Sequence, residues 1–259
     1  MDFEHIAVMR EDRLTIITIS RPEVMNALNA KANHELSAAF DAFGGDDDQW
    51  VAILTGAGER AFCAGHDLKQ QASGGGMDIP SSGFGGLTYR FDLSKPIIAA
   101  VNGVAMGGGF ELALACDLII ASQSARFALP EPKVGLTAFG GGVQRLPREI
   151  GLKRAMALML TGRATDAAEA LALGFVNEVV PAPELMTAAR NWASAILACS
   201  PMAIRATKEA AMRGLDCAIA TAIEEQWNYP AAKAMVRSKD FEEGPKAFVE
   251  RRSPLWRGR

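Results

Sequence analysis

The chain has 259 residues, of which 49% are hydrophobic and 22% charged, with a formal net charge of -3. This length and composition are typical of a globular protein with one sizeable domain and its own core. The near-neutral charge provides no basic field that would neutralise phosphates, so no nucleic-acid partner is expected.

Targeting signals are weak along the chain. The first residues, Met1 to His5, are acidic and lack an apolar core, so we expect no signal peptide. The longest tempting apolar run, Pro96 to Phe110, is interrupted by glycines and ends at Glu111. It falls short of the ~20 apolar residues that a membrane-spanning helix needs. We therefore expect a cytoplasmic protein that does not interact with a membrane.

Metal ligands are scarce. There are three histidines, and none of the four cysteines forms a C-x-x-C pair. A zinc site has little to build on, and we expect no metal. The cysteines are expected to be reduced, buried, small apolar residues of a reducing compartment. They are Cys63, Cys116, Cys199 and Cys217.

The first elements follow from local pattern. Alternating apolar residues in 6–8 and 14–19, separated by a charged turn, predict a β-hairpin. Asn29 is placed to cap a following helix, whose apolar face would carry Leu36, Phe40 and Phe43. Residues 51–54 then predict a buried strand.

Two segments before and after that strand are predicted to be loops. The acidic run 46–48 is expected to be a solvated loop. The glycine- and serine-rich segment 73–86 is interpreted as a floppy surface loop, with a mobile flap over a ligand as the alternative.

The middle of the chain predicts an α/β core. Residues 97–101 form a continuous β-branched and apolar strand, 110–115 a helix, and 118–120 another strand. This rhythm favours parallel strands with right-handed crossovers. The remaining pattern is mostly helical, so we expect an α/β core over residues 1–195 and a helical region over 196–259. The predicted helices beyond the last strand are 152–160, 166–173, 184–197, 201–212 and 217–236.

A glycine triplet, Gly107-Gly108-Gly109, lies between a predicted strand and a helix. The free amides at the start of a helix can stabilise an oxyanion, and glycine lets a ligand approach closely. A tight packing turn between strand and helix is the alternative. The run is not G-x-G-x-x-G, so a dinucleotide site is not favoured.

Two glutamates are candidates for acid–base chemistry. Glu111 precedes the apolar stretch 112–115, where water is scarce, and Glu131 is fixed between Pro130 and Pro132. Burial raises the pKa of a carboxyl group and suits it to proton transfer. The alternatives are a helix-start cap for Glu111 and a surface turn for Glu131.

The segment 62–69 supplies another glycine before a polar stretch, and with it further free amides. Cys63 and His66 lie three positions apart, but no cysteine–histidine–carboxylate set is discernible. We therefore do not favour cysteine catalysis.

Taken together, these motifs resemble the crotonase superfamily of enoyl-CoA hydratases and isomerases, from about residue 5 to the C-terminus. The segments 83–88 and 243–259 look most like its carnitinyl-CoA dehydratase branch. The motifs that carry the superfamily resemblance are Arg21-Pro22-x-x-x-Asn26-Ala27-Leu28-Asn29, Cys63-Ala64-Gly65-x-Asp67-Leu68, Gly107-Gly108-Gly109-x-Glu111 and Pro130-Glu131.

The resemblance implies a crotonase-like α/β spiral of ββα units with a C-terminal helical trimerisation region. It implies a homotrimer or dimer of trimers that takes an acyl-CoA substrate and needs no cofactor beyond the coenzyme A of that substrate. By the same resemblance, the amides of His66 and Gly108 form an oxyanion hole, and Glu111 and Glu131 hold and activate a water molecule.

The implied coenzyme A and substrate contacts come from several segments. Phe248 and Arg251 match positions that reach coenzyme A on a neighbouring subunit. The other implied contacts are Ala27, Leu28, Ala64, Asp67, Leu68, Lys69 and Phe139.

The sequence departs from the family at two positions. His66 replaces a small residue, usually alanine, and Ala138-Phe139 replaces a Pro-Gly pair whose glycine helps to place the water. Both changes bear on the size of the pocket. The expected activity is enoyl-CoA hydration or dehydration. The alternatives are carnitinyl-CoA dehydration, isomerisation, thioester hydrolysis, decarboxylation, or acyl-CoA binding without catalysis.

Overall fold

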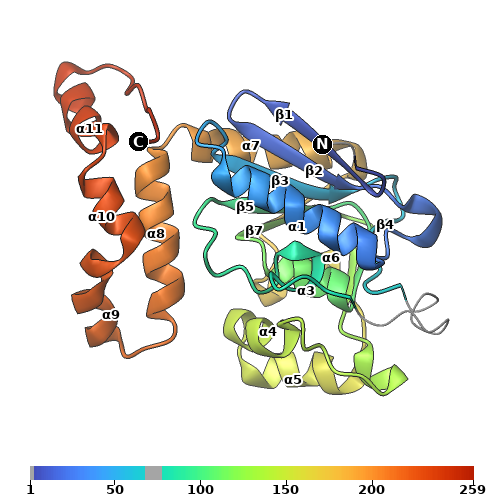
Figure 1. Cartoon of the computed structure of the whole chain (residues 1–259). Helices are drawn as coiled ribbons and strands as arrows, with labels where there is room; N and C mark the ends of the chain where they lie inside the picture. Colours follow the sequence, from blue (N-terminus) through green and yellow to red (C-terminus); the bar gives the residue numbers. More distant parts are fainter. Residues whose placement is uncertain (1–2, 68–77) are drawn as a thin grey trace.

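The computed structural model describes residues 3–67 and 78–259. Its framework is a six-stranded sheet in the order β1-β2-β3-β5-β7-β10 (Figure 1). A second sheet has the order β4-β6-β8-β9. The bounds of the first sheet are β1 Ile6–Glu11, β2 Leu14–Ile19, β3 Val51–Gly56, β5 Ile97–Val101, β7 Leu118–Ser122 and β10 Glu178–Val180. Those of the second are β4 Ala61–Cys63, β6 Val104–Met106, β8 Arg126–Ala128 and β9 Thr165–Asp166.

Successive strands from β3 to β8 alternate between the two sheets. The strands β3, β5 and β7 pair in parallel in the first sheet, and β4, β6 and β8 pair in parallel in the second. Each turn of the chain therefore adds one strand to each sheet. This confirms the expected spiral.

The six-stranded sheet is covered on both faces (Figure 1). Successive residues of a strand point to opposite faces. Ile53 accordingly packs in the same core layer as Ala189 of α7 (Leu185–Leu197). Its neighbour Leu54 packs in the layer of Phe40 from α1 (Ala30–Gly45). Burial on both sides explains why β3 and β5 are apolar at consecutive positions.

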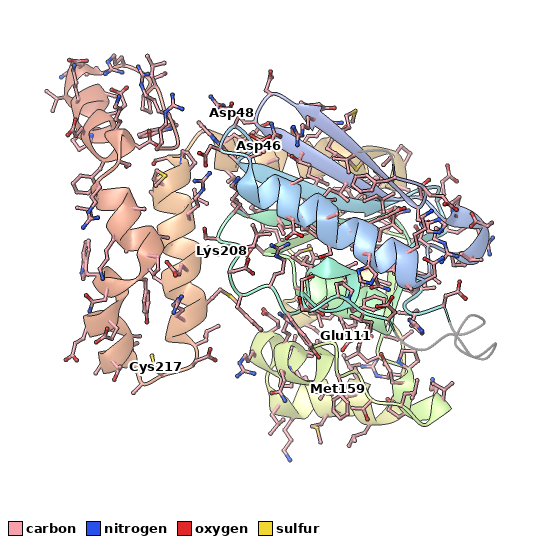
Figure 2. All side chains as sticks on the ribbon, in the orientation of Figure 1. Asp46, Asp48, Glu111, Met159, Lys208 and Cys217 are labelled. Carbon is pink, nitrogen blue, oxygen red and sulfur yellow. The ribbon has the colours of Figure 1, made fainter. Side chains whose placement is uncertain are left out.

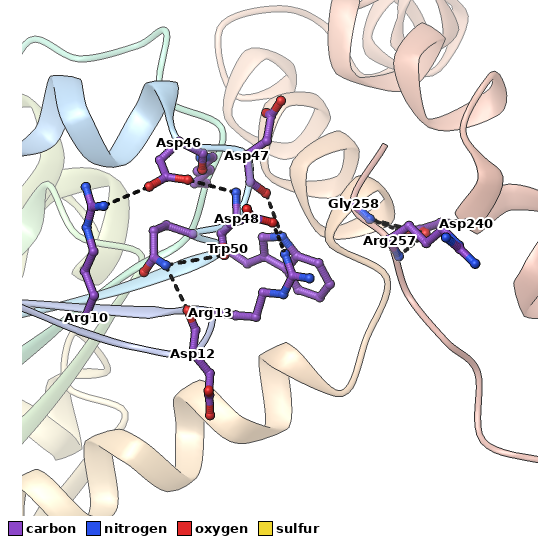
Figure 3. A network of polar contacts seen from close by, with 12 residues as sticks. Arg10, Asp12, Arg13, Asp46, Asp47, Asp48, Trp50, Asp240, Arg257 and Gly258 are labelled. Carbon is purple, nitrogen blue, oxygen red and sulfur yellow. Dashed lines mark hydrogen bonds and ion pairs between the residues drawn. The ribbon is translucent and has the colours of Figure 1, made fainter.

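The predicted N-terminal elements are confirmed. β1 and β2 form an antiparallel hairpin. The Asn29 side chain caps α1 by accepting a hydrogen bond of 2.8 Å from Ala32 N. The acidic loop after α1 is tied to the hairpin, because Asp46 pairs with Arg10 at 3.1 Å and Asp48 with Arg13 at 2.8 Å (Figure 3).

The C-terminal helices stand as a group beside the core (Figure 1). Residues 217–236, predicted as one helix, are two helices separated at 226–229, so that prediction is wrong. Pro230 lacks an N–H and holds Tyr229 in an extended conformation (φ -68°, ψ 146°), which ends the first helix. The helices of this group are α8 Pro201–Gly214, α9 Ile219–Glu225, α10 Pro230–Val236 and α11 Lys239–Glu250.

The C-terminal tail joins the helical group to the core. The buried Asp240 accepts hydrogen bonds from the amides of Arg257 (2.7 Å) and Gly258 (3.2 Å) (Figure 3). Gly258 packs against Trp50 so closely that a Cβ there would lie 3.0 Å from the indole nitrogen. The division at residues 195 and 196 stays a prediction; α7 itself runs to Leu197.

Two further helices, α4 (Gly142–Ile150) and α5 (Leu152–Thr161), lie between β8 and β9 of the second sheet, and α6 (Ala167–Leu173) follows β9. The sequence pattern did not predict α4. Within the part of the chain that the structure describes, no helix is both long and apolar enough to cross a membrane.

The cysteines are not all buried as expected. Cys63 is buried and Cys116 is half-buried, but Cys199 and Cys217 are exposed. Both exposed thiols lie near helix ends in the helical region, and Cys217 lies at its tip, far from Glu111 (Figure 2).

Candidate active site

The glycine triplet forms the turn from β6 into α3 (Gly108–Leu114). Gly107 has φ 54° and ψ -126°, a conformation that favours glycine. A Cβ on Gly108 would lie 2.7 Å from the Phe84 ring, and one on Gly109 would lie 1.9 Å from the carbonyl oxygen of Cys63. Close packing therefore explains Gly109, while Gly108 lies against an aromatic side chain.

The second backbone segment of the predicted oxyanion hole lies beside this turn. A Cβ on Gly65 would lie 3.2 Å from Gly108 N, so the two chain segments nearly touch. Leu28 forms a parallel bridge with His66, which turns the His66 N–H away from Leu28. Within residues 3–67 and 78–259, neither His66 N–H nor Gly108 N–H donates a hydrogen bond. Both amides are therefore available to a ligand.

The His66 imidazole is held without polar partners. Among the described residues, neither of its ring nitrogens has a hydrogen-bond partner, and both are buried. Burial lowers the pKa of His66, opposed by the neighbouring Asp67. Burial therefore favours the neutral form of the ring.

Glu111 lies in the first turn of α3, where this helix faces α4 (Figure 2). Its side chain is buried, with 5% exposure. Glu111 Oε1 accepts a hydrogen bond of 2.9 Å from Gly142 N. Gly140 also lies against this carboxyl group, since a Cβ added at Gly140 would lie 2.5 Å from Glu111 Oε2. The carboxyl group is thus held by the backbone at the start of α4 and does not cap its own helix, α3.

Glu131 begins a short 3-10 helix, η3 (Glu131–Val134), and its carboxyl group turns toward the glycine turn. A Cβ on Gly107 would lie 3.0 Å from Glu131 Oε1. Its Oε2 is buried and has no hydrogen-bond partner within the described residues. An unsatisfied buried oxygen is costly, which favours a ligand or a proton at this atom.

The charge of Glu131 acts on Glu111. Burial, and then the charge of Glu131, raise the pKa of Glu111 to about 7, opposed by the amides of Gly142 and Gly140 and by Arg145. Burial also raises the pKa of Glu131. A carboxyl group with a pKa near neutrality, such as that of Glu111, is suited to general acid–base catalysis at physiological pH.

The residues assigned to coenzyme A by resemblance form a second cluster. Leu28 N donates to Gly65 O at 2.8 Å, and Asp67 N donates to Leu28 O at 3.0 Å. Arg21 fastens the cluster by donating to Ala27 O and to Asp67 Oδ2.

Ala64 is joined to the same cluster through Met25 O at 3.0 Å. Leu68 and Lys69 lie outside the described residues, as do residues 73–77 of the glycine- and serine-rich segment.

Residues 83–86, at the end of that segment, are buried and do not form a floppy surface loop. The 3-10 helix η2 (Phe84–Gly86) is buried, and Gly85 N donates to the Asn33 side chain of α1 at 2.7 Å. Phe84 packs on Gly108. The segment is therefore a fixed wall beside the glycine turn.

Phe139 is exposed by 71%, next to Gly140 and the Glu111 carboxyl group. Tyr89 Oη donates to Phe139 O at 2.8 Å. By contrast, Phe248 and Arg251 lie at the end of α11, which is well separated from α3 in Figure 1. Within one chain they are not part of this site.

Sequence reasoning missed Gly140, Gly142 and Arg145. The available signal was a second glycine triplet, 140–142, placed before a helical stretch in the same way as the first. Within residues 3–67 and 78–259, no group of three or more His, Cys, Asp or Glu side chains is arranged to hold a metal ion.

A cavity of about 310 Å³ lies elsewhere and contains none of the predicted site residues. Acidic and basic side chains balance in its wall, so it shows no preference for an anion. The charged residues are Asp41, Asp47, Asp92, Arg90, Lys95 and Arg205.

Comparison with known proteins gives consistent matches over the whole chain. The sequence profile described as Enoyl-CoA hydratase/isomerase matches residues 10–259. A protein of Proteus mirabilis (strain HI4320) named carnitinyl-CoA dehydratase is 46% identical over 251 residues, which are 94% of each chain. One of the same name from Salmonella enteritidis PT4 (strain P125109) is 43% identical over 264 residues, covering 99% of each.

Solved structures agree with the sequence matches. An enoyl-CoA hydratase from Mycobacterium tuberculosis H37Rv superposes with a TM-score of 0.92 at 42% identity, covering 98% of this chain and 99% of that one. An enoyl-CoA hydratase from Bacillus anthracis gives a TM-score of 0.90 at 36% identity, with coverages of 99% and 100%.

Proposed function

The chain belongs to the enoyl-CoA hydratase/isomerase family, and on this premise we propose that it is a hydro-lyase acting on 2-enoyl-CoA thioesters. The forward reaction places the oxygen of water on C3 and a hydrogen on C2, and the reverse reaction removes both. The observation that carries the proposal is that Glu111 and Glu131 both border the turn that presents the free amide of Gly108.

In the proposed mechanism, the amides of His66 and Gly108 donate to the thioester oxygen. Attack of water at C3 moves negative charge onto that oxygen, where fixed donors stabilise it best. Removing one such donor typically costs ~10²–10³ in turnover. The proximity of the two segments and their free amides support this assignment.

We assign different tasks to the two glutamates. Glu111 accepts backbone N–H groups, which stabilise its carboxylate form, so it is suited to take a proton from water. Glu131 has an oxygen without a partner among the described residues, so it is suited to hold a proton and deliver it to C2. In the reverse direction the roles exchange.

The substrate we favour is a short or medium enoyl-CoA with an uncharged acyl chain. The aromatic side chains that are candidates to contact a trimethylammonium group are Tyr89, Phe84 and Phe139. The same region contains the guanidinium of Arg145, since Glu111 and Tyr89 are both near enough to act on its pKa. A second cation there would be repelled.

The competing candidate is a carnitinyl-CoA dehydratase, which the curated relatives at 42–46% identity favour. The test compares kcat/KM for crotonyl-CoA and crotonobetainyl-CoA on one preparation, with identification of the products. A tenfold advantage for the betaine thioester, roughly 1.4 kcal/mol in transition-state stabilisation, would reverse our preference. Binding of both thioesters without turnover would indicate an acyl-CoA-binding protein instead, and migration of the double bond would indicate an isomerase.

We further propose a trimer or a dimer of trimers, in which Phe248 and Arg251 reach coenzyme A bound to a neighbouring subunit. Their separation from the glutamates within one chain is compatible with this arrangement (Figure 1). Phe248 is exposed by 86%, so its ring is free to contact another molecule.

A further inference from the structure

Arg145 is a largely buried cation on α4 that forms no ion pair with a carboxylate within residues 3–67 and 78–259. Its Nη2 donates to the carbonyl oxygen of Thr88 at 2.8 Å. Its guanidinium lies 5.7 Å from the centroid of the Phe91 ring. A buried charge without an opposite partner is costly, so a position of this kind calls for an explanation.

The guanidinium lies between the two walls of the site. On one side it touches the 140–142 loop, since a Cβ on Gly141 would lie 2.1 Å from Nη1. This loop holds Glu111 through the amide of Gly142.

On the other side, Arg145 binds the segment that ends at Thr88. That segment begins with Phe84, whose ring packs on Gly108. Arg145 therefore connects the loop that holds Glu111, a proposed acid–base group, with the segment that packs on Gly108, whose amide is proposed for the oxyanion hole.

We propose that Arg145 is a positioning residue for the hydration reaction. It fixes the loop that holds Glu111 against the segment that carries Phe84, and its positive charge favours the carboxylate form of Glu111 over the protonated form. The inference rests on the proposed function, because it assigns Glu111 the task of accepting a proton from water.

The electrostatics agree with this geometry. The charge of Arg145 lowers the pKa of Glu111, against burial and Glu131, which raise it. The other titratable groups that act on Arg145 are Cys116, Tyr89 and Arg148. Removal of the guanidinium therefore raises the pKa of Glu111. The ionised fraction then falls at a given pH, and the acid limb of kcat/KM moves to higher pH.

The experiment compares Arg145→Met and Arg145→Lys with Arg148→Met, which removes an exposed arginine from the same helix. Arg145→Met is expected to lose on the order of 10² in kcat for crotonyl-CoA, the usual effect of a misplaced catalytic group, and to shift the acid limb upward. KM should stay the same, because Arg145 is not assigned to coenzyme A. Arg145→Lys keeps the charge, so the acid limb should return to its wild-type position while part of the kcat loss remains. Arg148→Met should match the wild type in both.

Two results would overturn the inference. One is a folded Arg145→Met protein with wild-type kcat and pH profile. The other is a loss of activity that is fully explained by a smaller amount of folded protein, with an unchanged pH profile in both Arg145 variants. If Arg145→Met does not fold, Arg145→Lys is used for this test.

Infrared difference titration against Glu111→Gln reads the Glu111 carboxyl group without turnover. It should show a higher pKa in Arg145→Met than in the wild type, and an unchanged pKa would also overturn the inference. If the wild type does not hydrate crotonyl-CoA, the proposed function fails, and the infrared result still decides whether Arg145 sets the charge of Glu111.

Discussion

Substitution of Glu111 by glutamine should remove activity and at the same time stabilise the fold at alkaline pH. The carboxyl group is buried against the 140–142 loop, and its pKa is raised from 4.5 to about 7. Its ionised form is therefore penalised in the folded state. Glutamine has nearly the same shape and can keep an oxygen toward Gly142 N, but it carries no charge to bury.

The magnitude follows from the size of the shift. Raising the pKa from 4.5 to about 7 corresponds to about 3 kcal/mol at ~1.36 kcal/mol per pKa unit. The penalty is absent well below pH 4.5, grows as the pH rises, and is complete above the folded-state pKa of about 7. The stability advantage of the variant should therefore increase by about 2–3 kcal/mol between about pH 5 and pH 8.

The assay is urea denaturation of wild type and Glu111→Gln at both pH values and at one protein concentration, because self-association shifts apparent stability. Glu149→Gln, which neutralises an exposed carboxyl group on α4, is the matched control and should show no such growth. Turnover of crotonyl-CoA by Glu111→Gln should fall by roughly 10²–10⁴, with binding of the thioester retained. An advantage equal at both pH values would refute the burial argument, and near-wild-type turnover would refute the catalytic role.

Three further outcomes are expected. Gly108→Ala places a methyl group 2.7 Å from the Phe84 ring. The ring must move, and kcat should fall by up to about 10²-fold in a folded protein; unchanged kinetics would contradict the proposed role of this wall. His66→Ala should reduce turnover by less than about tenfold, because only its amide is needed, and a larger loss would assign a chemical role to the imidazole. Sedimentation at micromolar concentration should show a trimer or hexamer, whereas a fully active monomer would contradict the proposed reach of Phe248 and Arg251.

The elements that were correctly predicted are those whose signals are local. The alternation in β1 and β2, the Asn29 cap and the continuous apolar run of β3 each lie within a few residues. The strands β4, β6 and β8 are three residues long and are stabilised by pairing with one another. No window of sequence that short distinguishes a strand from a loop, so the second sheet was not predicted from pattern.

The break between α9 and α10 shows a different failure. Ile219, Ile223 and Trp227 recur at every fourth position and fit one helical face, so the apolar pattern predicts a helix that continues through Pro230. Proline in a helix interior costs roughly 3 kcal/mol or more, which outweighs a few partly exposed apolar contacts. Here the backbone restriction imposed by proline outweighs the periodicity of the apolar residues.

In the site, the sequence predicts which groups are present but not how each is held. The burial of Glu111 follows from the apolar residues after it, and the free amides follow from the glycines before it. Its hydrogen bond to Gly142 spans 31 positions and exists because α4 packs against α3.

Burial is the largest cause of the raised pKa of Glu111, and distant partners modify it: the charge of Glu131 raises the pKa further, whereas the loop amides and Arg145 lower it. A motif shared by a family therefore specifies the proposed reacting groups, whereas α4 and the loop before it influence the pKa of Glu111. That loop contains Phe139, one of the two departures from the family. A substitution of Phe139 that changes substrate preference should also affect how Glu111 is held, because the next residue, Gly140, lies against the Glu111 carboxyl group.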